Sequence, residues 1–139
     1  MADYVLLFRN SGENPVPVDT DVSNDEWIKW ARPIWYDIRE TNTLNAAEAR
    51  ENDDERHICP LQLETIERCL RLWSNKGDII FDPFSGIAST GYEALKHGRK
   101  YVGIELKESY FQTGIRNLRA AESLSREKDP LFALIENAD

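Results

Sequence analysis

Residues 81–91 read FDPFSGIASTG, in which Gly86, Ala88 and Gly91 follow the spacing Gly-x-Ala-x-x-Gly. Loops with glycine at all three positions join a strand to a helix and bind nucleotide cofactors there. Alanine at the middle position is the one departure from that pattern. The elements around the loop and the charges at its ends indicate which ligand it would suit.

Helix and strand patterns alternate on both sides of this loop. Apolar side chains recur at helical spacing before it, with Pro60 in the expected first turn. A short apolar run typical of a buried parallel strand leads into the loop, and a second strand pattern follows after the next helix. Helices are predicted over residues 60–74, 89–97 and 109–125, and strands over residues 78–82 and 101–105. This order is half of a doubly wound sheet, so the predicted class is α/β with an incomplete, mostly parallel sheet.

The first 56 residues are less regular. Residues 4–8, YVLLF, have the β-branched and aromatic character of a strand. Ser23 or Asn24 can cap a short helix whose acidic first turn suits the helix dipole. Residues 39–56 are polar and strongly charged, which indicates an exposed connector with at most a short helix over residues 46–51.

Four aromatic residues lie close to Arg32, namely Trp27, Trp30, Trp35 and Tyr36. One interpretation is a satellite hydrophobic core under a loop. The other is a stacking platform beside a nucleic-acid path, because aromatic rings and arginine stack on bases. The first is favoured and the second stays open.

The charge is spread unevenly. Residues 1–56 carry a net charge of -7, residues 57–121 carry +2 and residues 122–139 carry -3. A self-sufficient nucleic-acid binder shows a basic footprint, which this chain lacks. No apolar run approaches the roughly 18 residues of a membrane span and no signal peptide is evident, so a cytoplasmic protein without membrane contact is expected.

The two cysteines, Cys59 and Cys69, are too few for a disulfide framework and lack the spacing of a zinc site. They are expected to be reduced thiols, and no metal site is predicted. Cys59 precedes Pro60 at an expected helix start, where the dipole could lower its pKa.

The charges at the ends of the glycine loop favour a cofactor without phosphate. For a dinucleotide, a methyl group at Ala88 would fill the space that the pyrophosphate needs, and Asp82 would bring a carboxylate close to phosphate oxygens. S-adenosylmethionine carries an ammonium and a sulfonium instead, which Asp82 would attract. Glu105, at the end of the next predicted strand, is placed to accept hydrogen bonds from the ribose hydroxyls. S-adenosylmethionine is therefore favoured over NAD or FAD.

Residues 57–118, HICPLQLETIERCLRLWSNKGDIIFDPFSGIASTGYEALKHGRKYVGIELKESYFQTGIRNL, resemble the cofactor-binding part of DNA amino-methyltransferases that modify adenine N6 or cytosine N4. The likeness is greatest to phage and prophage members, and it implies a role in DNA methylation of the restriction–modification kind. It extends upstream through GENPVPV (12–18) and IWYDIRETNTLN (34–45). The resemblance implies a partial Rossmann-like, S-adenosylmethionine-dependent methyltransferase fold.

The resemblance also assigns cofactor-binding residues. They are His57, Cys59 and Pro60 of a His-x-x-Pro segment that packs over the cofactor, Asp82, Pro83, Phe84, Gly86 and Ala88 of the loop, Ser89 and Thr90 at the helix start, and Glu105 as the ribose acid. Ala88 stands where the family has its second glycine, which implies weaker cofactor binding or relaxed selection. His97 is predicted only to cap a helix end.

The catalytic segment of this family is missing. These enzymes methylate the exocyclic amine of a flipped base with an Asp/Asn/Ser-Pro-Pro-aromatic tetrapeptide. No Pro-Pro pair occurs in the 139 residues, so no catalytic residue is assigned. The chain is interpreted as a C-terminal half. Residues 1–56 would be the end of the catalytic half with a short recognition or connector segment, residues 57–125 the S-adenosylmethionine-binding subdomain, and residues 126–139 an acidic tail.

Half of a sheet leaves an apolar strand with an open edge. We therefore expect a homo-oligomer, a strand exchange, a complementary catalytic-half chain or a chain of low stability, with double-stranded DNA bound by the completed enzyme. The leading hypothesis is a cofactor-binding half that is active only with its complement. The alternative is a non-catalytic cofactor-binding or interaction module, a prophage remnant; a nucleotide-dependent oxidoreductase is the least favoured.

Overall fold

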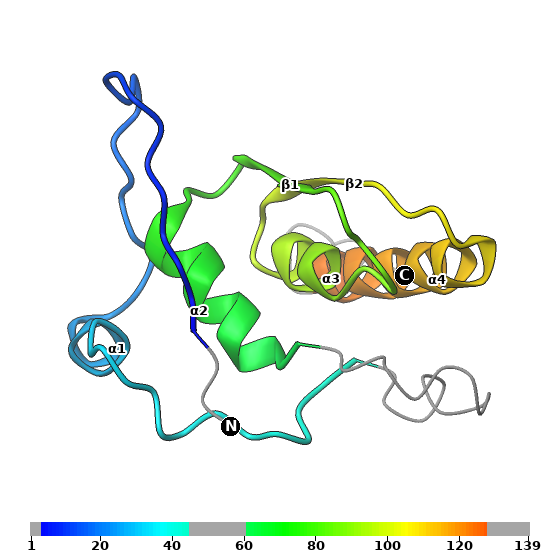
Figure 1. Ribbon diagram of the computed structural model, residues 1–139, viewed down its shortest axis with the longest axis horizontal. Coiled ribbons are helices and arrows are strands. Elements are labelled where there is room, and N and C mark those ends of the chain that lie inside the picture. The colour runs from blue at the N-terminus through cyan, green and yellow to red at the C-terminus, as the bar shows by residue number, and fades with distance from the viewer. Residues whose placement is uncertain (1–3, 45–60, 128–139) are drawn as a thin grey trace, which may run out of the picture.

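The structure is a computed structural model that describes residues 4–44 and 61–127 (Figure 1). Its elements, in chain order, are α1 (Asn24–Trp30), α2 (Leu63–Trp73), β1 (Ile79–Asp82), α3 (Ser89–Lys96), β2 (Lys100–Gly103) and α4 (Glu108–Glu127). From α2 onward, the predicted alternation of helix and strand is confirmed. The fold is α/β and matches part of a Rossmann-like fold.

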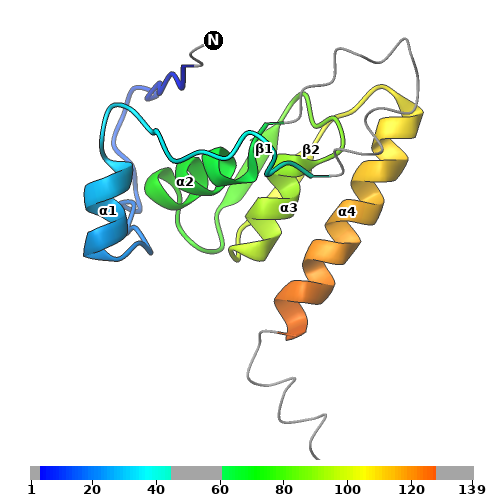
Figure 2. The ribbon, with the colours of Figure 1, turned by 90° about the horizontal axis from the view of Figure 1, so that it is seen from below.

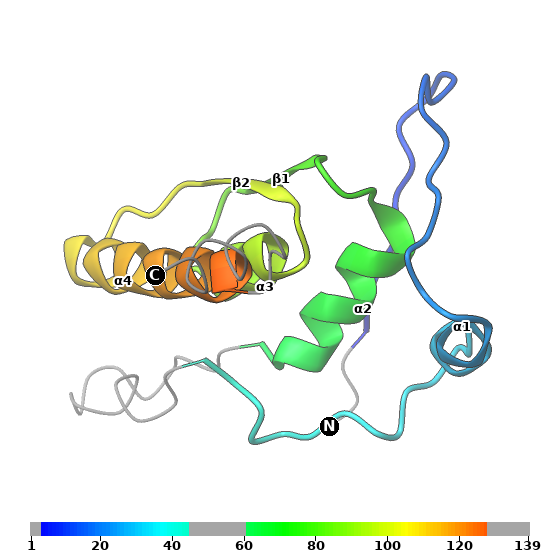
Figure 3. The same ribbon diagram turned by 180° about the vertical axis from the view of Figure 1, so that it is seen from behind.

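The two strands form a parallel sheet, and the described helices cover only one of its faces. Phe81 pairs with Val102 in the register. Helices α3 and α4 lie against the same face of the sheet, and no described segment covers the other (Figures 1 and 3). Ile79, Phe81 and Val102 are consequently 65%, 60% and 50% exposed. The prediction of parallel strands is confirmed. The strand predicted to be buried, residues 78–82, is instead partly exposed, because no described segment covers the second face of the sheet.

A small core lies between α2, α3 and the covered face. Ile66 and Leu70 of α2 and Ala94 of α3 are buried, and Ile80 and Tyr101 pack against them. The helical spacing predicted for α2 places its apolar residues on this core. The helix begins at Leu63, three residues later than predicted, and Pro60 lies outside the described residues.

The N-terminal part wraps around α2 (Figure 2). Helix α1 begins at a capping box, in which Ser23 Oγ accepts from the Glu26 N–H and the Glu26 carboxylate accepts from the Ser23 N–H. The predicted short helix is confirmed. The predicted helix over residues 46–51 lies outside the described residues.

Residues 4–8 do not form the predicted strand. Tyr4 and Phe8 are 84% and 83% exposed, and no strand lies beside them among residues 4–44 and 61–127. They belong to an extended segment that crosses α2 in the view of Figure 1 but stands away from this helix in Figure 2. A strand needs a partner to accept its backbone hydrogen bonds, and β-propensity alone does not supply one.

Gly91 sets the distance between α3 and its neighbours. A Cβ atom at this position would lie 2.6 Å from the Tyr101 ring and 2.7 Å from Leu118. We expect Gly91→Ala to lower the free energy of unfolding by about 2 kcal/mol, because the added methyl group overpacks the contact of α3 with β2 and α4. Denaturant unfolding would measure the change. Gly114→Ala is the milder comparison, since its new Cβ would lie 3.3 Å from the Ala88 methyl and 3.6 Å from backbone atoms of Gly86 and Ile87; an equal loss in both variants would contradict the packing explanation.

Candidate functional site

Two carboxylates mark the carboxyl ends of the two strands. Asp82 is the last residue of β1, and Glu105 follows β2. Glu105 reaches back to the glycine loop, where its Oε2 accepts from the Gly86 N–H at 2.7 Å, while its Oε1 accepts from the Lys107 N–H at 2.8 Å. The carboxylate of Glu105 therefore links the end of β2 to the loop that follows β1.

The carboxylate of Asp82 is held from two sides. Its Oδ1 accepts from the Phe84 N–H at 3.0 Å, and its Oδ2 lies 3.4 Å from the Tyr101 hydroxyl that donates to it. The same hydroxyl lies 2.8 Å from Ser85 Oγ. Both oxygens of Asp82 thus have a partner in the protein, which defines the direction in which the carboxylate points.

Backbone hydrogen bonds extend the pairing beyond the two strands. The Ile104 N–H donates to the Asp82 carbonyl at 3.0 Å, and the Ser85 N–H donates to the Ile104 carbonyl at 2.9 Å. From helix α4, Asn117 Nδ2 donates to the Ile87 carbonyl at 2.8 Å. The glycine loop is therefore attached to β2 on one side and to α4 on the other.

The loop turns into α3 through two residues with positive φ. Gly86 has φ +53° and Ala88, the N-cap of α3, has φ +63°. Ala88 is only 2% exposed, and its methyl group faces Gly114 of α4, where a Cβ atom would come within 3.3 Å of it. Gly114 of α4 thus leaves room for the methyl group that Ala88 has in place of a glycine. This methyl group is not accessible to a ligand.

Ala88→Gly is expected to change the affinity for S-adenosylhomocysteine by less than about twofold, because the deleted methyl group faces α4 rather than solvent. The free energy of unfolding should stay within about 1 kcal/mol of that of the unaltered chain. Glycine adopts the left-handed conformation without strain, which is stabilising, whereas the loss of a buried methyl group is destabilising. Calorimetry and denaturant unfolding would measure the two quantities. A gain in affinity of tenfold or more would instead mean that this methyl group obstructs the cofactor.

The predicted site residues are partly assembled. The structure brings together Asp82, Gly86 and Glu105, with the Phe84 ring 89% exposed beside them. Pro83 is exposed, and Ser89 and Thr90 lie half-buried at the start of α3. His57, Cys59 and Pro60 lie outside the described residues. Tyr101, Ser85 and Asn117 complete the arrangement and were not singled out from the sequence, in which Tyr101 only fitted a strand pattern.

Comparison with known proteins assigns the chain. A family described as DNA methylase (N6_N4_Mtase) matches residues 1–116. The chain belongs to this DNA methylase family. It is 31% identical to the type II methyltransferase M.BglI of Bacillus subtilis over 128 residues, which are 91% of this chain and 33% of that protein. It is 41% identical to the DNA adenine methyltransferase YhdJ of Escherichia coli K12 over 63 residues, or 45% of this chain and 21% of that protein.

A solved structure supports the same assignment. The candidate DNA modification methylase TTHA0409 of Thermus thermophilus, complexed with S-adenosyl-L-methionine, matches with a TM-score of 0.63 and 25% identity. The match covers 82% of this chain and 41% of that one. The DNA methylase chain thus spans about a third of M.BglI and about two fifths of TTHA0409.

In this DNA methylase chain, the aromatic cluster is built around arginines of α2 rather than around Arg32. The Arg68 guanidinium lies 5.5 Å from the Trp30 ring centroid and 5.3 Å from that of Trp35. Trp35 Nε1 also donates to the Trp30 carbonyl at 2.8 Å. Trp30 and Trp35 are half-buried against Arg68, whereas Trp27 and Tyr36 are exposed. Both the satellite-core and the base-stacking interpretations stay predictions.

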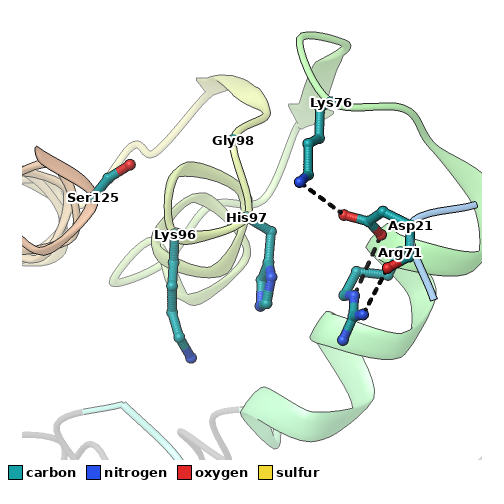
Figure 4. Close-up of a pocket in the computed structure, with 7 residues that line it drawn as sticks. All are labelled: Asp21, Arg71, Lys76, Lys96, His97, Gly98 and Ser125. Carbon is teal, nitrogen blue, oxygen red and sulfur yellow. Dashed lines mark hydrogen bonds and ion pairs between the residues drawn. The ribbon is translucent and has the colours of Figure 1, made fainter. Parts of the chain in front are cut away.

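A charged pocket of about 480 Å³ is lined in part by His97 and Gly98, shortly before β2, and neither Asp82 nor Glu105 lines it. Figure 4 shows Arg71 and Lys76 extending toward Asp21. Arg71 is paired with Asp21, Glu26 and Glu67 at 3.3, 3.1 and 3.0 Å, and Lys96 with Glu93 at 3.0 Å. Because carboxylates already neutralise these cations, the pocket is poorly suited to an anion.

The two remaining predicted features have structural roles. His97 is the C-cap of α3, as predicted, and its Nε2 lies 3.1 Å from Glu93 Oε2. Burial raises the pKa of the Cys69 thiol, which favours the unreactive protonated form. Within residues 4–44 and 61–127, no three His, Cys, Asp or Glu side chains are placed to hold one metal ion, and none of the helices has the length and apolar character of a membrane span.

Proposed function

We propose that this chain is the S-adenosylmethionine-binding portion of a site-specific DNA methyltransferase that acts on adenine N6 or cytosine N4. The observation that carries the proposal is the placement of Asp82 and Glu105 at the ends of adjacent parallel strands, on either side of the loop at Gly86. Ligands of open α/β sheets bind at the carboxyl ends of the strands. A cofactor with a cationic amino-acid end and a ribose fits this pair of carboxylates.

Each carboxylate has acceptor capacity left for a ligand. An ionised carboxylate offers about four lone-pair sites, and the two backbone contacts of Glu105 use two of them. The others can accept from the two ribose hydroxyls. In this proposal Asp82 attracts the ammonium, and Phe84 and Gly86 help to hold the cofactor in line for direct transfer of its methyl group to the amine nitrogen.

The other predicted cofactor contacts stay part of the proposal. His57, Cys59 and Pro60 would pack over the cofactor, and Pro83, Ala88, Ser89 and Thr90 would shape the loop and the start of α3. Residues 57–125 would form the cofactor-binding subdomain, although α4 continues to Glu127. A phage or prophage origin and a cytoplasmic location stay predictions from the sequence.

We also propose that a complementary chain supplies the catalytic tetrapeptide. The uncovered face of the sheet supports this, because Ile79, Phe81, Val102 and Ile104 are each at least half exposed. In addition, β1 pairs with β2 alone among the described strands, which leaves its other edge open. A catalytic-half chain could add strands at this edge and cover the apolar face; a second copy of this chain would cover it without adding the tetrapeptide.

Calorimetry tests the cofactor assignment. We expect S-adenosylmethionine and S-adenosylhomocysteine to bind with a stoichiometry of one per chain. An absence of heat at millimolar ligand, with the protein folded by circular dichroism, would contradict the assignment.

A methyl-transfer assay tests the partner. With radiolabelled S-adenosylmethionine and double-stranded DNA, this chain alone should transfer no label. Addition of a catalytic-half polypeptide that contains an Asp-Pro-Pro-Tyr type segment should restore transfer. Cofactor binding without transfer to DNA in any such mixture would favour the alternative of a non-catalytic module.

A further inference from the structure

Tyr101 occupies a slot that two glycines leave open. Its ring lies on the covered face of the sheet, and a Cβ atom at Gly91 would come within 2.6 Å of its Cδ1 and Cε1. A Cβ atom at Gly103 would come within 2.6 Å of its hydroxyl oxygen and 2.8 Å of Ser85 Oγ. Any side chain at either position would therefore displace the tyrosine from its place.

The slot brings the Tyr101 hydroxyl to the base of the glycine loop. There it lies 2.8 Å from Ser85 Oγ and 3.4 Å from Asp82 Oδ2. Burial, together with the negative charge of Asp82, raises the pKa of Tyr101 to about 12. The hydroxyl consequently keeps its proton at neutral pH and remains a donor.

The contacts of Asp82 give this donor a specific role. The Phe84 N–H donates to Asp82 Oδ1, and the Tyr101 hydroxyl, from the neighbouring strand β2, donates to Asp82 Oδ2. Without Tyr101, the carboxylate would be fixed at one oxygen only and could rotate about its Cβ–Cγ bond. A carboxylate binds a ligand ammonium more tightly when its orientation is already fixed in the free protein, because less conformational freedom is lost on binding.

We propose that Tyr101 is a positioning residue. Its hydroxyl, which also contacts Ser85 Oγ, orients the Asp82 carboxylate toward the ammonium of the methyl donor. The inference rests on the proposed function, because it takes Asp82 to be the partner of that ammonium. Tyr101 touches no ligand in this proposal and acts only through Asp82.

Tyr101→Phe tests the proposal with two ligands that differ at one end. S-adenosylhomocysteine carries the ammonium, whereas 5′-methylthioadenosine has the same purine, ribose and sulfur without the amino-acid end. We expect calorimetry to show about fivefold weaker binding of S-adenosylhomocysteine and unchanged binding of 5′-methylthioadenosine. The effect is modest because 3.4 Å is long for an O–H···O hydrogen bond.

A double-mutant cycle then tests whether Tyr101 acts through Asp82. In an Asp82→Asn background, Tyr101→Phe should have no further effect on S-adenosylhomocysteine, because the group that it positions is gone. Equal weakening of both ligands, no weakening of either, or fully additive effects would overturn the role of Tyr101. Absence of binding of either ligand to the unaltered chain would overturn the cofactor assignment as well, so the two failures are distinguishable.

Discussion

Asp21→Asn is expected to lower the free energy of unfolding by about 3 kcal/mol, because it leaves the buried Arg99 guanidinium without its carboxylate partner. The Arg99 side chain is 0% exposed, and its Nη1 lies 3.0 Å from Asp21 Oδ2. Arg99 also donates to the Ser74 and His97 carbonyls. These bonds stay in the variant, but a neutral amide cannot balance the charge.

Asp19→Asn is the matched control. It removes the same charge two residues away, but the hydrogen bond of Asp19 to Asn75 is made by its backbone N–H, which donates to Asn75 Oδ1 at 2.7 Å. Urea unfolding followed by circular dichroism would compare the two variants. We expect Asp19→Asn to stay within about 0.5 kcal/mol of the unaltered chain; similar losses in both variants would contradict a specific role for the pair of Asp21 and Arg99.

The ion pair of Asp21 and Arg99 also predicts that the stability of the fold depends on pH. Burial opposes ionisation of Asp21, but the hydrogen bonds and charges of Arg99 and Arg71 outweigh it and hold its pKa below the usual value. The folded pKa then lies below the unfolded one, about 3.9, so the stabilisation is present at neutral pH and is lost as the pH falls through the folded pKa. Stability measured between pH 6 and pH 3 should fall less steeply for Asp21→Asn than for the unaltered chain.

Glu105→Gln is expected to weaken S-adenosylhomocysteine binding by about 100-fold, for two physical reasons. Both carboxylate oxygens accept from backbone N–H groups, of Gly86 and Lys107. A glutamine has one acceptor oxygen, so its NH₂ group would face one of these donors. The variant would also lose a charge-assisted acceptor for the ribose, and each such hydrogen bond contributes about 1.5–3 kcal/mol.

Glu108→Gln is the control for Glu105→Gln. It removes a carboxylate from the first turn of α4, where Glu108 accepts from Gln112 at the surface. Its affinity should stay within about twofold of the unaltered chain. If Glu105→Gln bound S-adenosylhomocysteine as tightly as this control, the ribose role of Glu105 would be contradicted.

The glycine-loop site was predictable to the extent that it depends on order along the chain. Asp82 and Glu105 each follow a short apolar run, and parallel strands present their carboxyl ends at one edge, so the two acids were expected to lie together. The contribution of Tyr101 was not predictable. It depends on Gly91 and Gly103, which leave room for the Tyr101 side chain. Gly91 lies ten residues before Tyr101 in the sequence, so their contact forms only when α3 packs on the sheet.

The sequence by itself determined the elements whose hydrogen bonds and apolar contacts close within a few residues. The capping box of Ser23 and Glu26, the helical face of α2 and the start of α3 after the loop are of this kind. Tertiary structure alone decided the pairing of Asp21 with Arg99, which are 78 residues apart, and the exposure of β1. It also decided that residues 4–8 have no strand partner within the described part of the chain. Local patterns report the propensity of a segment and the spacing of its side chains, whereas burial, strand pairing and ion pairing depend on which distant segments are present to meet it.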